Sequence, residues 1–139
     1  MGPVSRYAPP LAVMALIFGL SATPDLSSGL GPLDLWLRKA AHMTIYAALW
    51  LTLMRAAGWR RPAVATVVAL LYAVTDEIHQ THVSGRHGTP VDVAIDGVGM
   101  GLAALAWWLT TRRRGRPGPP WPLRASAAAA PTASRARWR

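Results

Sequence analysis

Long apolar stretches alternate with short polar segments along the chain. The apolar stretches cover residues 11–22, 40–54, 63–75 and 91–109, and the last is interrupted by Asp92 and Asp96. Each is shorter than the roughly 20 residues that an α-helix needs to cross the hydrocarbon core of a bilayer. A buried helix of a soluble protein, a re-entrant segment or a signal peptide has a similar length, so length alone does not separate these alternatives.

Three of the stretches reach spanning length when the polar residues at one end of each lie in the membrane interface or in a bundle interior. This interpretation predicts helices over about residues 35–57, 62–80 and 90–111, and a shorter first helix over about residues 8–23. The predicted fold class is therefore an all-α membrane protein. Four transmembrane helices form a small bundle, in one domain over residues 1–111.

The first stretch has a second interpretation, a cleaved signal peptide. Arg6 would be its n-region, residues 11–20 its apolar region, and residues 21–23 a poor cleavage site. A proline directly after the small residues, here Pro24, does not suit a cleavage site. Pro9 and Pro10 fit the start of a helix better, and Pro24 fits its end. We favour the transmembrane helix and keep the signal peptide as its alternative.

Composition supports a membrane protein, and the distribution of charge argues against a nucleic-acid partner. The chain is 52% hydrophobic and 15% charged, so its apolar share is higher and its charged share lower than in a typical soluble domain. Its net charge is +9, but eight of its fifteen basic residues lie in residues 112–139. We expect this segment to be a disordered, basic, cytoplasmic tail near anionic lipid headgroups. The other basic residues flank apolar spans and form no face with interleaved aromatic residues.

The positions of the basic residues also predict the orientation in the membrane. With both termini in the cytoplasm, twelve of the fifteen basic residues lie on the cytoplasmic side, and only Arg38, Lys39 and Arg86 lie outside. The predicted location is the inner (cytoplasmic) membrane, which the chain crosses several times. It has no cysteine, which excludes disulfide and thiolate chemistry.

This orientation brings polar residues of three helices to the outer end of the bundle. They are Asp34, Arg38, Lys39 and His42 of the second helix, Asp76, Glu77, His79 and Gln80 of the third, Arg86 of the following loop, and Asp92 and Asp96 of the fourth. Asp34 is suited to cap its helix, and Arg38 and Lys39 to reach the headgroups by snorkelling. His42 lies too deep for that, so we expect it to face an inward partner.

The carboxylates of the third and fourth helices need partners, because a charge at membrane depth costs roughly 2.5 to 3.5 kcal/mol. Helical spacing places Asp76 beside His79 and Gln80, and Asp92 on the same face as Asp96. We expect Arg86 to bridge the last two, or to bind a phosphate or carboxylate of a ligand through its planar fork. The alternative is a purely structural set of ion pairs.

Glycines and histidines of this region suggest helix packing and a metal site. Gly97 and Gly101 have the small-xxx-small spacing that allows another helix to approach closely. Zinc would find suitable ligand types in His79, His82 and His87 together with Asp76, Asp92 and Asp96. These residues match no recognised zinc-binding pattern, so we expect neither a metal nor another cofactor.

The segments RKAAHMTIYAALWL and TDEIHQTHVSGRHGTPVDVAIDGVGMGLA together resemble the VanZ-like membrane proteins. The pattern of that family is Lys-x-x-His at the start of a helix, Asp-Glu-x-x-Gln, a Gly-Arg-x-Gly loop, and Asp followed by Asn and glycines. The matching residues are Lys39 and His42, then Asp76, Glu77 and Gln80, then Gly85, Arg86 and Gly88, then Asp92, Gly97 and Gly101. This chain has Asp96 where the family usually has Asn. The resemblance covers about half of the chain and implies a role in the cell envelope, since the family is named for low-level teicoplanin resistance.

Three functional hypotheses follow. The first is binding of membrane lipids, in particular an anionic lipid or a lipid-linked cell-wall intermediate, in support of envelope processes or glycopeptide resistance. Its expected ligand-binding residues are Lys39, His42, Asp76, Glu77, Gln80, Arg86, Asp92 and Asp96. The second is an intramembrane hydrolase or transferase acting on a lipid phosphate, with Asp76, Glu77 and His79 as acid/base candidates. The third is a structural or assembly subunit.

Overall fold

Four α-helices make up the computed structural model, which describes residues 2–24 and 31–113. They are α1 (Pro3–Ser21), α2 (Pro32–Ala56), α3 (Pro62–Gln80) and α4 (Pro90–Arg113). Each helix begins at a proline, because the fixed φ of proline suits the first turn and its missing N–H is not needed there. The predicted tail begins at residue 112, but α4 continues to Arg113, and the rest of that tail, residues 114–139, lies outside the described residues.

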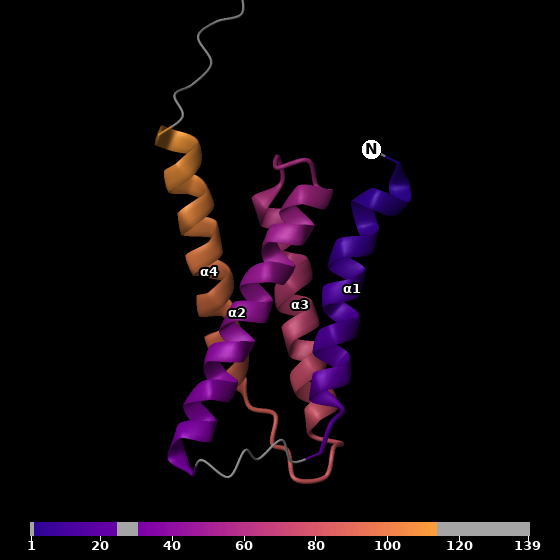
Figure 1. Cartoon of the computed structure of the whole chain (residues 1–139), viewed down its shortest axis with the longest axis vertical. Helices are drawn as coiled ribbons and strands as arrows, with labels where there is room; N and C mark the ends of the chain where they lie inside the picture. Colours follow the sequence, from indigo (N-terminus) through magenta and orange to yellow (C-terminus); the bar gives the residue numbers. More distant parts are fainter. Residues whose placement is uncertain (1, 25–30, 114–139) are drawn as a thin grey trace, which may run out of the picture.

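The helices run alternately up and down the bundle. The last residues of α1 and α3 therefore lie at the same end as the first residues of α2 and α4 (Figure 1). We call this end the polar end. Among the described residues α2 contacts all three other helices and packs most extensively on α4, whereas α1 and α4 do not touch.

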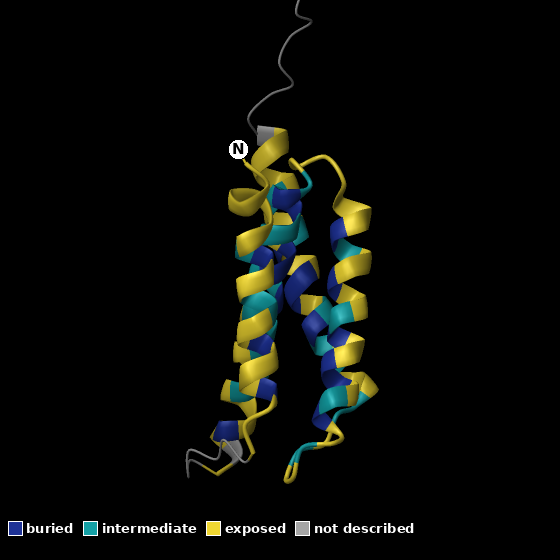
Figure 2. Ribbon diagram, turned by 90° about the vertical axis from the view of Figure 1, so that its right-hand side faces the viewer, coloured by how far each residue is buried: buried dark blue, intermediate teal, exposed yellow. Residues whose placement is uncertain are grey.

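The core consists of rows of side chains spaced by four residues. In α2 the row is Tyr46, Trp50 and Met54, and in α3 it is Ala65, Ala69 and Ala73, all at most 2% exposed. The outward faces carry large apolar residues, and exposed residues cover the outside of the helices (Figure 2). The small residues on the inner face of α3 and the large apolar residues on the outer faces of the bundle suit a lipid environment.

Three of the four helices, α1, α3 and α4, are long and apolar enough to cross a membrane, by length and composition. The 25-residue α2 is not among them. Asp34, Arg38, Lys39 and Arg55 all lie within α2 and lower its apolar share. The all-helical fold is confirmed for the described residues, and the placement of α2 across the membrane stays a prediction.

The start of α1 differs from the prediction. The helix begins at Pro3 instead of about residue 8, and Pro9 and Pro10 lie inside it, so they do not mark its start. Because Pro9 has no N–H, the carbonyl of Ser5 loses its helical donor. The Arg55 guanidinium of α2 donates to that carbonyl at 3.1 Å, which satisfies it from outside the helix. Of the other helices, α3 has the predicted bounds.

Close packing of α4 on α2 depends on Gly99. A Cβ at this position would lie 2.2 Å from the backbone oxygen of Met43. The two glycines predicted to allow close approach do not do so within the described residues. The nearest atom to a Cβ on Gly97 would be 3.9 Å away, on Leu70, and nothing lies within 4 Å of one on Gly101. Within the described residues the close contact is made by Gly99, which the small-xxx-small spacing did not select.

Candidate functional site

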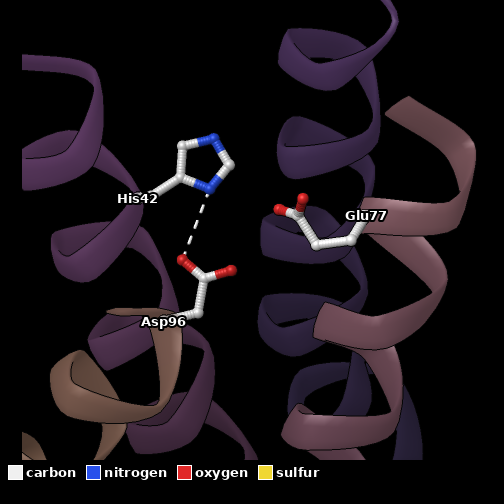
Figure 3. A group of neighbouring side chains, drawn as sticks. All are labelled: His42, Glu77 and Asp96. Carbon is white, nitrogen blue, oxygen red and sulfur yellow. Dashed lines mark ion pairs between the residues drawn. The ribbon is translucent and has the colours of Figure 1, made fainter. Parts of the chain in front are cut away.

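Ionisable residues continue the buried rows at the polar end. His42 precedes Tyr46 by four residues, Glu77 follows Ala73 by four, and Asp96 precedes Met100 by four. Since residues four apart share a helix face, the packing of the apolar rows turns these three ionisable side chains toward one another. Figure 3 shows them converging from α2, α3 and α4.

A pocket of about 260 Å³ opens among these helices, and we call it the polar pocket. Its lining is Leu35, Arg38, Lys39, His42, Glu77, Gln80, Gly85, Arg86, His87, Asp92, Ile95 and Asp96. The structure thus brings together all of the predicted ligand-binding residues except Asp76.

Two ion pairs join the parallel helices α2 and α4. Lys39 Nζ lies 2.6 Å from Asp92 Oδ1, and His42 Nδ1 lies 3.3 Å from Asp96 Oδ1. The inward partner expected for His42 is therefore present. The Lys39 side chain is only 27% exposed and is paired with Asp92, and its reach to the headgroups stays a prediction.

Arg86 does not bridge Asp92 and Asp96, which corrects the sequence-based expectation. Its Nε donates to the carbonyl of Thr23, at the end of α1, at 3.1 Å. This contact ties the loop between α3 and α4 to the end of α1 and leaves the guanidinium on the wall of the polar pocket. Helical spacing could not show this, because Arg86 lies in a loop.

Asp34 and Arg38 form a local pair in the first turns of α2. Two nitrogens of the Arg38 guanidinium donate to Asp34 Oδ2, at 3.1 and 2.5 Å. Asp34 is not the N-cap residue of α2 that the sequence suggested, because that position is Gly31. A carboxylate in the first turn is nevertheless favourable to the helix dipole.

Thr89 organises the loop before α4, and the sequence analysis missed it. Its backbone N–H donates to Glu77 Oε2 at 3.0 Å, and its hydroxyl donates to Asp92 Oδ2 at 2.7 Å. The Asp92 N–H donates to the same hydroxyl at 3.3 Å, which is one half of a capping box. The other half is absent, because the Thr89 N–H donates to Glu77 and not to Asp92. The segment Thr-Pro-Val-Asp, residues 89–92, carries that signal in the sequence.

Asp76 and His79 face α1 instead of the polar pocket. Asp76 Oδ2 accepts hydrogen bonds from Ser21 Oγ at 2.9 Å and from Gln80 Nε2 at 3.1 Å. The Gln80 partner was expected, but His79 stacks on Phe18 with ring centroids 4.5 Å apart and makes no described bond to Asp76. The three acid/base candidates are therefore divided, with only Glu77 in the polar pocket.

An apolar groove of about 200 Å³ adjoins the polar pocket between α1 and α2. Its apolar walls are Ile17, Leu20, Ala41 and Ile45, and its polar lining is Ser21, Arg38, His42 and Arg86. Three of these residues, Arg38, His42 and Arg86, also line the polar pocket. The two cavities therefore meet at a polar junction.

Comparison with known proteins gives one match. No curated protein and no solved structure matches the chain significantly. The model of the VanZ/LLP1 family matches residues 6–111, which contain nearly all of the four helices and every residue of the polar pocket. The chain therefore belongs to the VanZ/LLP1 family.

Proposed function

We propose that this VanZ-family protein binds an anionic lipid at the outer face of the cytoplasmic membrane, with the lipid phosphate at the polar pocket and a hydrocarbon chain in the apolar groove. The observation that carries the proposal is the junction of the two cavities at Arg38, His42 and Arg86. An amphiphile requires that arrangement, a polar site continuous with an apolar one. A lipid-linked cell-wall intermediate has the same phosphate chemistry and would connect the protein to envelope processes and teicoplanin resistance.

The two arginines at the junction are the groups suited to hold the phosphate. The guanidinium fork matches two phosphate oxygens in a planar, bidentate geometry. Lys39, also expected to hold the anion, is engaged with Asp92, so its proposed role becomes positioning that carboxylate. Glu77 and Asp96 would repel a phosphate unless a proton or a cation offsets their charge.

Arg86→Lys is expected to weaken binding of an anionic lipid by at least about tenfold, because lysine keeps the charge but loses the bidentate fork. The measurement is native mass spectrometry of the full chain with phosphatidylglycerol, a polyprenyl phosphate and phosphatidylcholine. Tighter binding of the polyprenyl phosphate than of phosphatidylglycerol would identify the cell-wall carrier as the source. Arg60→Lys is the matched control, because Arg60 lies at the opposite end of the bundle and should leave binding unchanged. Equal binding of phosphatidylcholine, or an Arg86→Lys protein that binds as the wild type does, would contradict the proposal.

The orientation can be tested with single cysteines, since the chain has none of its own. Thr81 is exposed at the polar end, and Arg60 is exposed at the other end. We expect a membrane-impermeant thiol reagent applied to intact cells to label Thr81→Cys and not Arg60→Cys. The reverse pattern would place the polar pocket in the cytoplasm and remove the link to an outer-face lipid.

A lipid-phosphate hydrolase or transferase is the second candidate. It is favoured only by the presence of Glu77 and His42 in one pocket, where a carboxylate and an imidazole can act as acid and base. Release of phosphate from a polyprenyl diphosphate by the wild-type protein, and its loss in Glu77→Gln, would favour this candidate over binding alone.

A further inference from the structure

Three side chains from three helices converge at the floor of the polar pocket. His42, Glu77 and Asp96 each offer one potential ligand atom, and these atoms all lie within 4.8 Å of one another (Figure 3). They are separated by 35 and 19 residues along the chain, so no short sequence motif records the cluster. Only the packing of α2, α3 and α4 brings them together.

The carboxylates of this cluster are buried and incompletely bonded. Asp96 is 0% exposed and Glu77 is 5% exposed. Within the described residues, Glu77 Oε1 and Asp96 Oδ2 have no hydrogen-bond partner, and the contact of Asp96 Oδ1 with His42 Nδ1 at 3.3 Å does not have the geometry of a hydrogen bond. A buried polar group without a partner costs free energy, and a buried ionised carboxylate costs considerably more. In Figure 3 the Glu77 carboxylate points across the gap toward Asp96 and the His42 ring.

Among the described contacts, no lysine or arginine near the cluster pairs with Glu77 or Asp96. Lys39 contacts Asp92, and Arg38 contacts Asp34. The Nε of Arg86 is directed to the Thr23 carbonyl. The two buried carboxylates of the cluster are therefore matched by a single imidazole among the described contacts, and the floor of the pocket has an excess of negative charge.

We propose that His42, Glu77 and Asp96 bind a divalent transition-metal ion, of which Zn²⁺ and Mn²⁺ fit the ligand set best. One imidazole nitrogen and two carboxylate oxygens are the mixed ligands that these ions accept. The 3.3 Å between His42 Nδ1 and Asp96 Oδ1 is about the separation of two ligands placed tetrahedrally around an ion with bonds of about 2.0–2.2 Å. The prediction of no metal rested on linear spacing, which cannot detect ligands on three helices.

The groups around the cluster suit this role. The Thr89 N–H holds Glu77 Oε2 and leaves Oε1 free for an ion. Such bonds to the second oxygen of a ligand fix its orientation. Gly88 allows this contact, because a Cβ there would lie 2.0 Å from the backbone oxygen of Glu77. The polar pocket supplies the space for a fourth ligand from outside the protein.

The metal site stands on these three side chains and does not depend on which molecule fills the rest of the pocket. The two proposals therefore fail separately. A protein that binds Zn²⁺ or Mn²⁺ but shows no preference for anionic lipid would retain the metal site and lose the lipid proposal.

The test uses the full chain in nanodiscs of neutral lipid, stripped with a chelator and titrated with Zn²⁺ and with Mn²⁺ by calorimetry. We expect one ion per chain. His42→Gln, Glu77→Gln and Asp96→Asn should each weaken binding by at least about 100-fold, since removing a residue that only hydrogen-bonds a ligand already costs about 10–100-fold. Asp34→Asn is the matched control, because it removes a carboxylate at the same end of the bundle outside the cluster. Undiminished binding in all three variants, or no binding by the wild type, would overturn the proposal.

A measurement on the wild type is independent of how well the variants fold. Electron spin-echo spectroscopy of the Mn²⁺-loaded protein should show coupling to one imidazole nitrogen, which changes when histidine is labelled with ¹⁵N. Bound Mn²⁺ without a nitrogen coupling would mean that His42 is not a ligand and that the site is not the one proposed.

Discussion

Gly99→Ala is expected to destabilise the bundle by about 3 kcal/mol, at the upper end of the range for an overpacked interior. The new Cβ would lie 2.2 Å from the Met43 oxygen and 2.8 Å from its Cα and carbonyl carbon. All three atoms belong to the backbone of α2, so no side-chain rotation relieves the contact. The helices α2 and α4 must move apart, which also lengthens the two ion pairs that join them toward the polar end. The free energy of unfolding can be measured in mixed micelles against increasing sodium dodecyl sulfate, with far-UV circular dichroism.

Gly101→Ala is the matched control for this substitution. It lies two residues further along the same helix, and a Cβ there would meet nothing within 4 Å. Because alanine is the better helix former, this variant should be unchanged or more stable by about 0.5–1 kcal/mol. A Gly101→Ala protein that is as unstable as Gly99→Ala would show that the face of α4 carrying Gly97 and Gly101 is packed, contrary to the structure.

The contrast between these glycines shows where sequence reasoning stops. The hydrophobic periodicity and the turn residues predicted the helices well, and α3 runs from Pro62 to Gln80 as predicted. The prediction also named the helices that meet at the polar end. A helical period gives the residues that share a face, but not the rotation of one helix relative to another. That rotation decides whether Gly99, or instead Gly97 and Gly101, makes the close contact.

The same limit explains the ion pairs. Asp92 and Asp96 were correctly placed on one face in need of cations, yet their partners are Lys39 and His42 and not Arg86. Partner choice depends on the axial register of α2 against α4, which no pattern within either helix contains. Thr89 is different, because its cap to the Asp92 N–H is local, and residues 89–92 carry the signal that the sequence analysis overlooked.

The predicted start of α1 was wrong for another reason. Pro9 and Pro10 were interpreted by their intrinsic preference for the first turn. In the fold, a residue 50 positions away satisfies a carbonyl that Pro9 leaves free, since Arg55 donates to Ser5. A tertiary contact thus overrides a local propensity, and no window of sequence around the prolines includes it.

Lys39→Met is expected to lower the free energy of unfolding by about 3 kcal/mol. It removes the partner of Asp92 while leaving a carboxylate whose side chain is only 27% exposed. Breaking a buried ion pair from one side typically costs about 3–5 kcal/mol, and the partial exposure places this pair at the lower end. The remaining bond from the Thr89 hydroxyl to Asp92 limits the loss further. The same unfolding assay in mixed micelles measures the effect.

The double variant Lys39→Met with Asp92→Asn distinguishes two roles of Lys39: holding α2 against α4 through Asp92, or binding the ligand directly. If the pair serves to hold α2 against α4, removing both charges should recover most of the stability and leave a net loss of about 1 kcal/mol. With the single variant Asp92→Asn measured as well, the coupling energy should be at least about 2 kcal/mol. Lipid binding should then recover together with stability. Should stability return while binding of the polyprenyl phosphate stays weak, Lys39 would contact the ligand directly, and the role proposed here for the two arginines would extend to it. Stability that does not return at all would mean that Lys39 and Asp92 contribute independently, because uncoupled residues add their effects.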